Sequence, residues 1–354
     1  MNDDHAIKGI HHITLVAARA DRTIRFYTSV LGLRLVKKTV NFDRPTTYHL
    51  YFGDQVGAPG TLVTFFEQPD APPARLGVGT THHLALTVDS FDALLKWKTW
   101  LQHAHLLVAG PYDHRAYRSI IFTDPDGVIL EIATREPGWQ SLGERHDAFV
   151  HPSEVLGRET WPEPVTEIAP DMAIRGLHHL AALGSDIERT DAFYQELLCM
   201  PCLYRTTEPD TGRPRWYWST GSGDEAGRPG TVIIYSTSGD LVPTTRGHVG
   251  HGMAHHFAFE VGSDDALGYW RDYLGQRGVE VTDILDRKYF RSIYFHDPDG
   301  HLLEIATTLP GFLVDEPADR LGEDLTLPAW LEPRRAEIEA SLPPLGVSHP
   351  PGSS

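Results

Sequence analysis

The chain repeats one arrangement of residues at an interval of 173 positions. In its second half a histidine pair ends at His256, and Glu304 follows 48 positions later. In its first half a histidine pair ends at His83, and Glu131 again follows 48 positions later. Self-similarity at a fixed interval is typical of a fold that is assembled from copies of one supersecondary unit.

Two more histidine pairs show that the repeat is fourfold. These pairs end at His12 and His179, and each is followed 14 positions later by a phenylalanine, Phe26 or Phe193. Each pair lies in an apolar segment that favours a strand, and a segment with helical spacing of apolar residues comes next. Further strand candidates, separated by turn residues, complete each copy. The sequence therefore predicts an α+β chain of four βαβββ modules.

The four modules divide into two halves. We expect an N-terminal domain at 9–134 with the first and second modules, and a C-terminal domain at 176–308 with the third and fourth. The segment 135–175 carries several prolines and many charges and is interpreted as a linker, and 309–354 is expected to form a C-terminal tail. The expected helices are Arg22–Val30, Phe91–Gln102, Ile187–Leu198 and Asp264–Gly275.

Composition excludes some classes of partner. The formal net charge of the 354 residues is −17, and no cluster of Lys and Arg offsets it. Nucleic acids and anionic membranes bind proteins through such basic clusters, so neither is an expected partner. Apolar residues at 41% and charged residues at 22% are typical of an ordinary globular protein. The first residues lack the features of a signal peptide, and no run of about 18 apolar residues follows, which predicts a cytoplasmic protein.

The histidine pairs also indicate which side chains face a cleft. Successive side chains of a regular strand point to opposite faces, so only one histidine of each pair is expected to face inward. The second histidine of each pair shares its face with small and polar residues and is expected to be the inward one. These second histidines are His12, His83, His179 and His256. The first members, including His11 and His255, are then expected on the face that packs against the helices.

The two glutamates point to a metal. Glu131 and Glu304 lie in apolar strands, where a carboxylate is costly unless it is paired or bound to a metal ion. Two histidines and one carboxylate form the ligand set that holds iron and leaves coordination positions open. The alternative is that the histidines are buried structural residues. That alternative would suffice for a single pair, but it explains less well four pairs with two glutamates at matched spacing. His301, next to Gly300, is expected to be an exposed turn residue rather than a ligand.

Longer stretches around these motifs carry a family resemblance. They are Gly9–Thr14, Leu31–Asp43, Tyr48–Phe52, Asp286–Phe295 and Trp330–Arg335. With the four modules, they resemble the vicinal-oxygen-chelate superfamily, which includes glyoxalase I, fosfomycin and bleomycin resistance proteins and extradiol dioxygenases. The chain resembles in particular the hydroquinone ring-cleaving dioxygenases, including the enzyme that opens chlorinated hydroquinones. This resemblance implies that the modules pair into two cupped mixed sheets, the vicinal-oxygen-chelate fold.

The resemblance also implies an activity, an Fe(II)-dependent dioxygenase that opens a hydroquinone- or catechol-type ring with O₂. Its iron would be held by His12, His256 and Glu304, and Mn(II) suits the same ligand set. The substrates would be a small aromatic diol and O₂, and the protein would be a homo-oligomer. The polar neighbours with catalytic roles would be His11, Thr14, His255, Arg287 and Tyr294.

Two other functions stay open, a glyoxalase-like metal-dependent isomerase or lyase and a non-enzymatic protein that binds a small aromatic molecule. Glyoxalases of this superfamily carry a further carboxylate at a position that corresponds here to Thr64 or Ile234, and neither residue can supply it. The pairing of the modules is also open. The resemblance favours module one with module four, whereas spacing equally allows one with two. Pairing of modules two and three would assemble a second ligand set from His83, Glu131 and His179.

Overall fold

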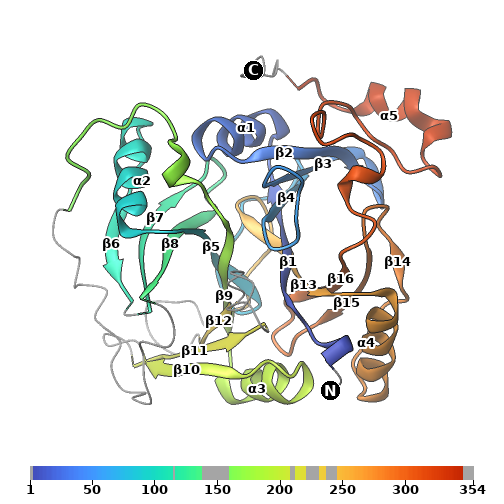
Figure 1. The fold of residues 1–354 in the computed structure, drawn as a ribbon. Coiled ribbons are helices and arrows are strands. Elements are labelled where there is room, and N and C mark those ends of the chain that lie inside the picture. Colours follow the sequence, from blue (N-terminus) through green and yellow to red (C-terminus); the bar gives the residue numbers. More distant parts are fainter. Residues whose placement is uncertain are drawn as a thin grey trace.

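The computed structural model describes residues 3–114, 116–137, 159–207, 212–220, 231–236 and 245–345. Within them, the strands form two eight-stranded mixed sheets (Figure 1). Positions 138–158 of the expected linker and 346–354 of the expected tail lie outside the described residues. The predicted α+β class with two mixed sheets is confirmed.

The first sheet is built from modules one and four, in the order β14-β15-β16-β13-β1-β4-β3-β2. Its two central strands, β1 and β13, are antiparallel, and each has a parallel neighbour on its other side. Module one supplies β1 (Gly9–Ala17), β2 (Arg34–Asn41), β3 (Arg44–Gly53) and β4 (Leu62–Glu67). Module four supplies β13 (Met253–Val261), β14 (Leu285–Asp286), β15 (Arg291–His296) and β16 (Leu302–Thr307).

The second sheet is built from modules two and three, in the order β10-β11-β12-β9-β5-β8-β7-β6. Its central strands β5 and β9 are again antiparallel. Module two supplies β5 (Thr80–Val88), β6 (Ala109–Asp113), β7 (Tyr117–Thr123) and β8 (Ile129–Pro137). Module three supplies β9 (Gly176–Gly184), β10 (Cys202–Thr207), β11 (Pro214–Ser219) and β12 (Thr231–Ser236).

The order of the strands decides the pairing that spacing leaves open. Module one pairs with module four and module two with module three, as the family resemblance favours. The two domains expected at 9–134 and 176–308 therefore each contribute one module to each sheet. Strands that are far apart in sequence, β1 and β13, lie side by side in the middle of the first sheet (Figure 1).

Helices follow the first strand of each module, as expected. They are α1 (Ala20–Arg25) with a π-helical turn at Phe26–Val30, α2 (Phe91–His103), α3 (Ile187–Asp191) with a π-helical turn at Ala192–Leu197, and α4 (Asp264–Gln276). A further helix, α5 (Arg335–Ser341), lies in the C-terminal tail. Trp97 of α2 and Trp270 of α4 are fully buried in the core between helices and sheets. Their indole N–H groups donate to the backbone carbonyls of Met172 and His5, so the large rings are buried without an unpaired donor. Among the described residues, no helix is long and apolar enough to span a membrane.

Each histidine pair lies at a β-bulge. Where β1 pairs with β13, the register shifts at His11 and at His255, so each is an extra residue opposite one partner. The pairing of β5 with β9 shifts in the same way at His82 and His178. Because a bulge re-aims the side chain of its extra residue, the two rings of every pair meet, with Nδ1 atoms 2.7–2.9 Å apart. The expectation that His11 and His255 pack against the helices is therefore wrong.

The turn between β15 and β16 of the first sheet packs against the second sheet. His301, expected to be exposed in this turn, is only 4% exposed. Its Nδ1 lies 2.7 Å from a carboxylate oxygen of Asp297, and its Nε2 lies 3.1 Å from the backbone carbonyl of Thr80 at the start of β5. The expectation of an exposed residue is wrong because a strand of the second sheet lies against this turn.

Candidate metal centre

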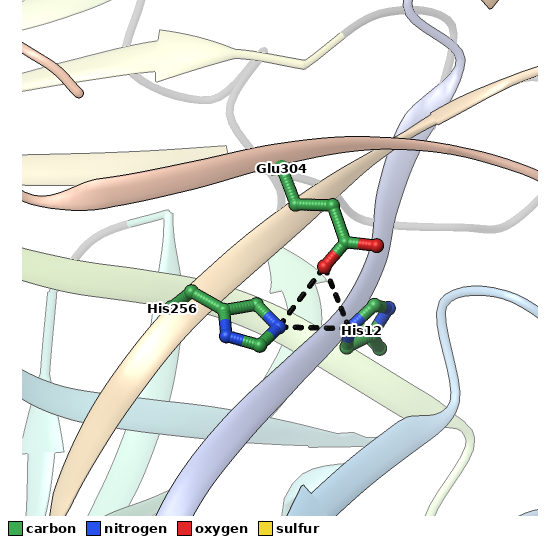
Figure 2. A group of neighbouring side chains, drawn as sticks. All are labelled: His12, His256 and Glu304. Carbon is green, nitrogen blue, oxygen red and sulfur yellow. Dashed lines mark hydrogen bonds and ion pairs between the residues drawn. The ribbon is translucent and has the colours of Figure 1, made fainter. Parts of the chain in front are cut away.

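His12, His256 and Glu304 point toward one another from β1, β13 and β16 (Figure 2). The Nε2 atoms of the two histidines are 3.3 Å apart. Oε2 of Glu304 lies 3.4 Å from Nε2 of His12 and 3.0 Å from Nε2 of His256. All three side chains are buried. The fold thus brings together the three residues that the family resemblance implies as ligands, although they lie at opposite ends of the chain.

These separations match one face of a metal coordination sphere. With bonds of about 2.1 Å, neighbouring ligand atoms lie about 3.0 Å apart in an octahedron and about 3.4 Å apart in a tetrahedron. The three atoms can therefore bind one ion together and leave its opposite side open. Within the part of the chain that the structure describes, no fourth His, Cys, Asp or Glu belongs to this group.

The environment of Glu304 fits a cation. Its Oε1 is buried and has no hydrogen-bond partner among the described residues, while Oε2 faces the two imidazole nitrogens. Burial alone would raise the pKa of Glu304, but the imidazoles of His12 and His256 bring this pKa well below its ordinary value. Burial also lowers the pKa of His256, which favours the neutral ring that binds metals. A buried carboxylate beside imidazole lone pairs is stabilised by a bound cation.

The bulged histidine His11 orients His12 from behind. Its Nδ1 lies 2.9 Å from Nδ1 of His12, and its Nε2 lies 3.1 Å from the backbone carbonyl of Thr307. The carbonyl only accepts, so His11 donates to it from Nε2 and accepts from His12 at Nδ1. His12 then carries its proton on Nδ1, and its Nε2 lone pair points at the centre of the group. Such outer partners fix the tautomer and orientation of metal-binding histidines.

His255 plays the corresponding part beside His256 but also reaches a cavity. The two Nδ1 atoms are 2.8 Å apart, so a proton on Nδ1 of His256 leaves His255 with its own proton on Nε2. Burial, followed by the neighbouring His256, lowers the pKa of His255 to about 3, which keeps the ring neutral. His255 therefore offers an N–H donor rather than a base.

A cavity of about 380 Å³ lies beside the three converging residues. Of the five polar neighbours that the resemblance implies, His255, Arg287 and Tyr294 line it, whereas His11 and Thr14 do not. Its lining consists of His12, Asn41, Phe42, Asp43, His49, Tyr51, Phe66, His255, His256, Thr282, Leu285, Arg287, Phe290, Tyr294, Leu302 and Glu304. The mixture of aromatic walls and a few convergent polar groups is typical of a small-molecule site.

Thr14 is connected to the cavity by a chain of hydrogen bonds, which includes two residues that the sequence did not predict, His49 and Tyr51. Its hydroxyl lies 2.8 Å from that of Thr64, which in turn lies 3.1 Å from Nε2 of His49. Nδ1 of His49 meets the hydroxyl of Tyr51 at 3.0 Å, and both rings line the cavity. Alternation along β3 places His49 and Tyr51 on one face, which is the signal that could have found them. Thr64 is thus engaged in this chain of hydrogen bonds.

The geometry of the site agrees with a family assignment. The sequence profile of the Glyoxalase/Bleomycin resistance protein/Dioxygenase superfamily matches residues 9–132 and 176–305. The chain belongs to this superfamily. The two matched stretches lie within the two expected domains, and together they contain all three residues of the group.

Proteins that resemble this chain over nearly its whole length are named as dioxygenases. MhqA of Bacillus subtilis strain 168, whose name assigns it to the ring-cleaving dioxygenases, is 35% identical over 96% of this chain and 99% of its own. The chlorohydroquinone/hydroquinone 1,2-dioxygenase of Sphingobium indicum is 29% identical over 94% of this chain and 95% of its own. A Bacillus subtilis crystal structure described as a dioxygenase is 33% identical and covers 97% of this chain and 99% of its own, with a TM-score of 0.77. Maize glyoxalase I, at 17% identity, a TM-score of 0.56 and coverage of 85% and 92%, shares the fold.

Proposed function

We propose that this protein is a dioxygenase that opens a hydroquinone- or catechol-type ring with O₂, and that Fe(II) bound by His12, His256 and Glu304 serves this reaction. The observation that carries the proposal is a group of three convergent ligand atoms with one side open toward a cavity. The name of the Sphingobium relative supports the class of substrate. Three ligands from the protein leave positions for two substrates, which favours an oxygenase over a glyoxalase with four.

The cavity has the size and walls that a single ring requires. An apolar cavity of about 150 Å³ accepts benzene, so 380 Å³ holds a ring with hydroxyl substituents. Phe290 lies against the ring of His12, and Phe66 against that of His256, with ring centroids 5.4 and 6.2 Å apart. These phenylalanines hold a bound ring next to the metal-binding residues, because aromatic rings pack favourably edge-to-face or offset.

Iron at this group would supply binding positions for a ring oxygen and for O₂ and would pass electrons between them. Tyr294 supplies a proton donor to the bound ring. Its hydroxyl oxygen accepts hydrogen bonds from Nε of Arg287 at 3.2 Å and from the hydroxyl of Ser292 at 3.3 Å. Burial and the nearby Glu304 raise the pKa of Tyr294, so the phenol keeps its proton near neutral pH. With its oxygen so engaged, Tyr294 directs that proton toward an oxygen atom in the cavity.

Arg287 and His255 complete the polar part of the cavity. The guanidinium of Arg287 is paired with Asp43 at 3.1 Å and brings positive charge to the cavity wall. This charge stabilises a ring oxygen that has lost its proton, as an opposite charge does for any anion. His255 donates from Nε2, so the two side chains hold the ring oxygens in place without removing a proton.

Oxygen uptake tests the proposal. Metal-free protein is loaded with Fe(II) under anaerobic conditions and mixed with aerated hydroquinone or catechol in an oxygen electrode. We expect one O₂ to be consumed for each ring opened, together with loss of the aromatic absorbance. The matched variant Glu304→Gln keeps the shape of the side chain but loses its charge, so it should lose both metal and activity. Absence of oxygen uptake with every such ring, for the Fe(II)- and the Mn(II)-loaded protein, would contradict the proposal.

The same experiment separates the alternative functions. Conversion of the substrate without oxygen uptake would indicate an isomerase or lyase. Saturable binding of the ring without any product would indicate a binding protein. The homo-oligomeric state stays a prediction, for which light scattering of the purified protein is the measurement.

A further inference from the structure

The second sheet contains another group of converging ligand atoms. Nε2 of His83 on β5 lies 3.0 Å from Nε2 of His179 on β9. Oε2 of Glu131 on β8 lies 3.0 Å from the first nitrogen and 3.5 Å from the second. All three side chains are buried, and they come from both halves of the chain. The three distances are within 0.4 Å of those in the first sheet.

The hydrogen bonds that His83 and His179 make through Nδ1 leave their Nε2 atoms available to bind a cation. The Nδ1 atoms of His83 and His179 are engaged with the bulged histidines His82 and His178, at 2.8 and 2.7 Å. Two Nε2 atoms and one carboxylate oxygen therefore converge on one point, where a metal ion or a proton must separate them. Oε1 of Glu131 is buried without a hydrogen bond in the described part of the chain, and Nε2 of His114 lies 3.8 Å from it. One divalent metal ion can bond to all three atoms at once at these separations.

The surroundings of the second group differ from those of the first. On β15, Tyr294 lies directly opposite Glu304, whereas on β7 the residue opposite Glu131 is Ile121. The residue that corresponds to Arg287 also differs, because it is His114 in module two. In module four the backbone N–H of Arg287 donates to the carbonyl of Phe290, and in module two the N–H of His114 donates to the carbonyl of Tyr117 in the same way. The second group therefore lacks counterparts of Tyr294 and Arg287, and the guanidinium that acts electrostatically on its His179 is that of Arg215 on β11.

We propose that His83, Glu131 and His179 bind a second divalent transition-metal ion, and that no ring is cleaved there. Imidazole and carboxylate ligands together suit Mn(II), Fe(II), Co(II) or Zn(II). The ion links β5, β8 and β9, and therefore joins modules two and three across the centre of the second sheet. Its binding does not depend on the proposed ring cleavage, and only the statement that this site is not a second reaction centre rests on it.

Counting bound metal tests the proposal without any substrate. Metal-free protein is titrated with Mn(II), and free Mn(II) is followed by electron paramagnetic resonance. We expect two equivalents bound to the wild type, one to Glu131→Gln, one to Glu304→Gln and none to the double variant. The two single variants are matched, since each replaces the same buried carboxylate by its isosteric amide. Near-UV circular dichroism verifies that each variant is folded.

The outcomes are distinct. One equivalent in the wild type that Glu304→Gln removes would overturn the proposal, and so would two equivalents in Glu131→Gln. The number of Mn(II) ions bound by Glu304→Gln decides the question even where Glu131→Gln fails to fold. A rise in the melting temperature of Glu304→Gln on addition of Mn(II) supports an intact second site. Oxygen uptake is read separately: Fe(II)-loaded Glu131→Gln is expected within about twofold of the wild type, as for sites without shared partners. Loss of oxygen uptake in Glu131→Gln with the first site still loaded would overturn the assignment of the second as inactive.

Discussion

The phenol of Tyr294 differs from the other polar groups of the cavity because its partners engage its oxygen and leave its proton for the ligand. Tyr294→Phe keeps the ring but removes that donor, together with the oxygen that accepts from Arg287 and Ser292. A hydrogen bond to a charged oxygen contributes about 1.5–3 kcal/mol, so kcat/KM for ring cleavage should fall about 10- to 100-fold. Metal content should be unchanged, because the phenol does not belong to the ligand group.

Tyr48→Phe is the matched control for this change. Tyr48 lies on the same sheet, but its hydroxyl donates to the backbone carbonyl of Pro343 and does not line the cavity. Its removal should leave kcat/KM unchanged. Full activity of Tyr294→Phe in oxygen uptake, or loss of metal from it, would show that the phenol has another role.

His11 contacts the ligand group through His12, so the effect of its hydrogen bond can be tested separately. Leucine and asparagine have almost the same shape, but only asparagine can accept the hydrogen bond from Nδ1 of His12. Loss of an outer partner of this kind typically weakens metal binding about 10- to 100-fold, so His11→Leu should bind Mn(II) that much more weakly. His11→Asn should recover part of the affinity. Equal affinities of the two variants in a competition with a chelator would argue against orientation through this hydrogen bond.

At the scale of elements, the sequence predicted the strands and helices of the modules but not the bulges in the central strands. The alternation rule assumes a regular strand. One extra residue at a bulge moves the side chains of all residues before it to the opposite face of the sheet. A signal was present in β1, where Ile10 and Ile13 are both in the core although three positions apart. Leu177 and Leu180 of β9 show the same odd step. Two neighbouring histidines hid the change of phase, because either could be the inward residue.

The turn between β15 and β16 leads to a prediction about pH. Burial opposes a charge on His301, but Asp297 raises its pKa above the ordinary 6.5. Because the folded state favours the protonated ring, this pair stabilises the protein fully below about pH 6.5 and loses its effect as the pH rises through the raised pKa. The free energy of unfolding, measured in urea, should therefore be higher for the wild type than for His301→Gln, and this difference should be larger at about pH 6 than at about pH 9.

His103→Gln is the control for this comparison. His103 is exposed at the end of α2, so its removal should give a stability difference that changes little between the two pH values. If the difference in the free energy of unfolding between the wild type and His301→Gln increased toward high pH, this would contradict a protonated His301. It would indicate that the neutral ring makes the bonds to Asp297 and to the backbone of Thr80.

For the whole molecule, spacing could not decide how the modules pair. Either arrangement gives each site one histidine from one module and a histidine with a glutamate from the other, so the repeat looks the same in both. Only the order of strands in the sheets, or a resemblance to a family with known pairing, distinguishes the two. In this fold each sheet, and each group of ligands, takes one module from each half of the chain.

This arrangement predicts how the two halves behave when they are separated. Fragments 1–147 and 148–354, expressed alone, should bind no Mn(II) at the affinity of the whole chain, because neither contains three ligands of one group. Expressed together they should pair and recover both equivalents, since the unpaired central strands β1, β5, β9 and β13 complete one another. The full chain cleaved only at 147 is the control and should keep both ions. Tight Mn(II) binding by one isolated half would instead mean that the modules pair within 9–134 and within 176–308.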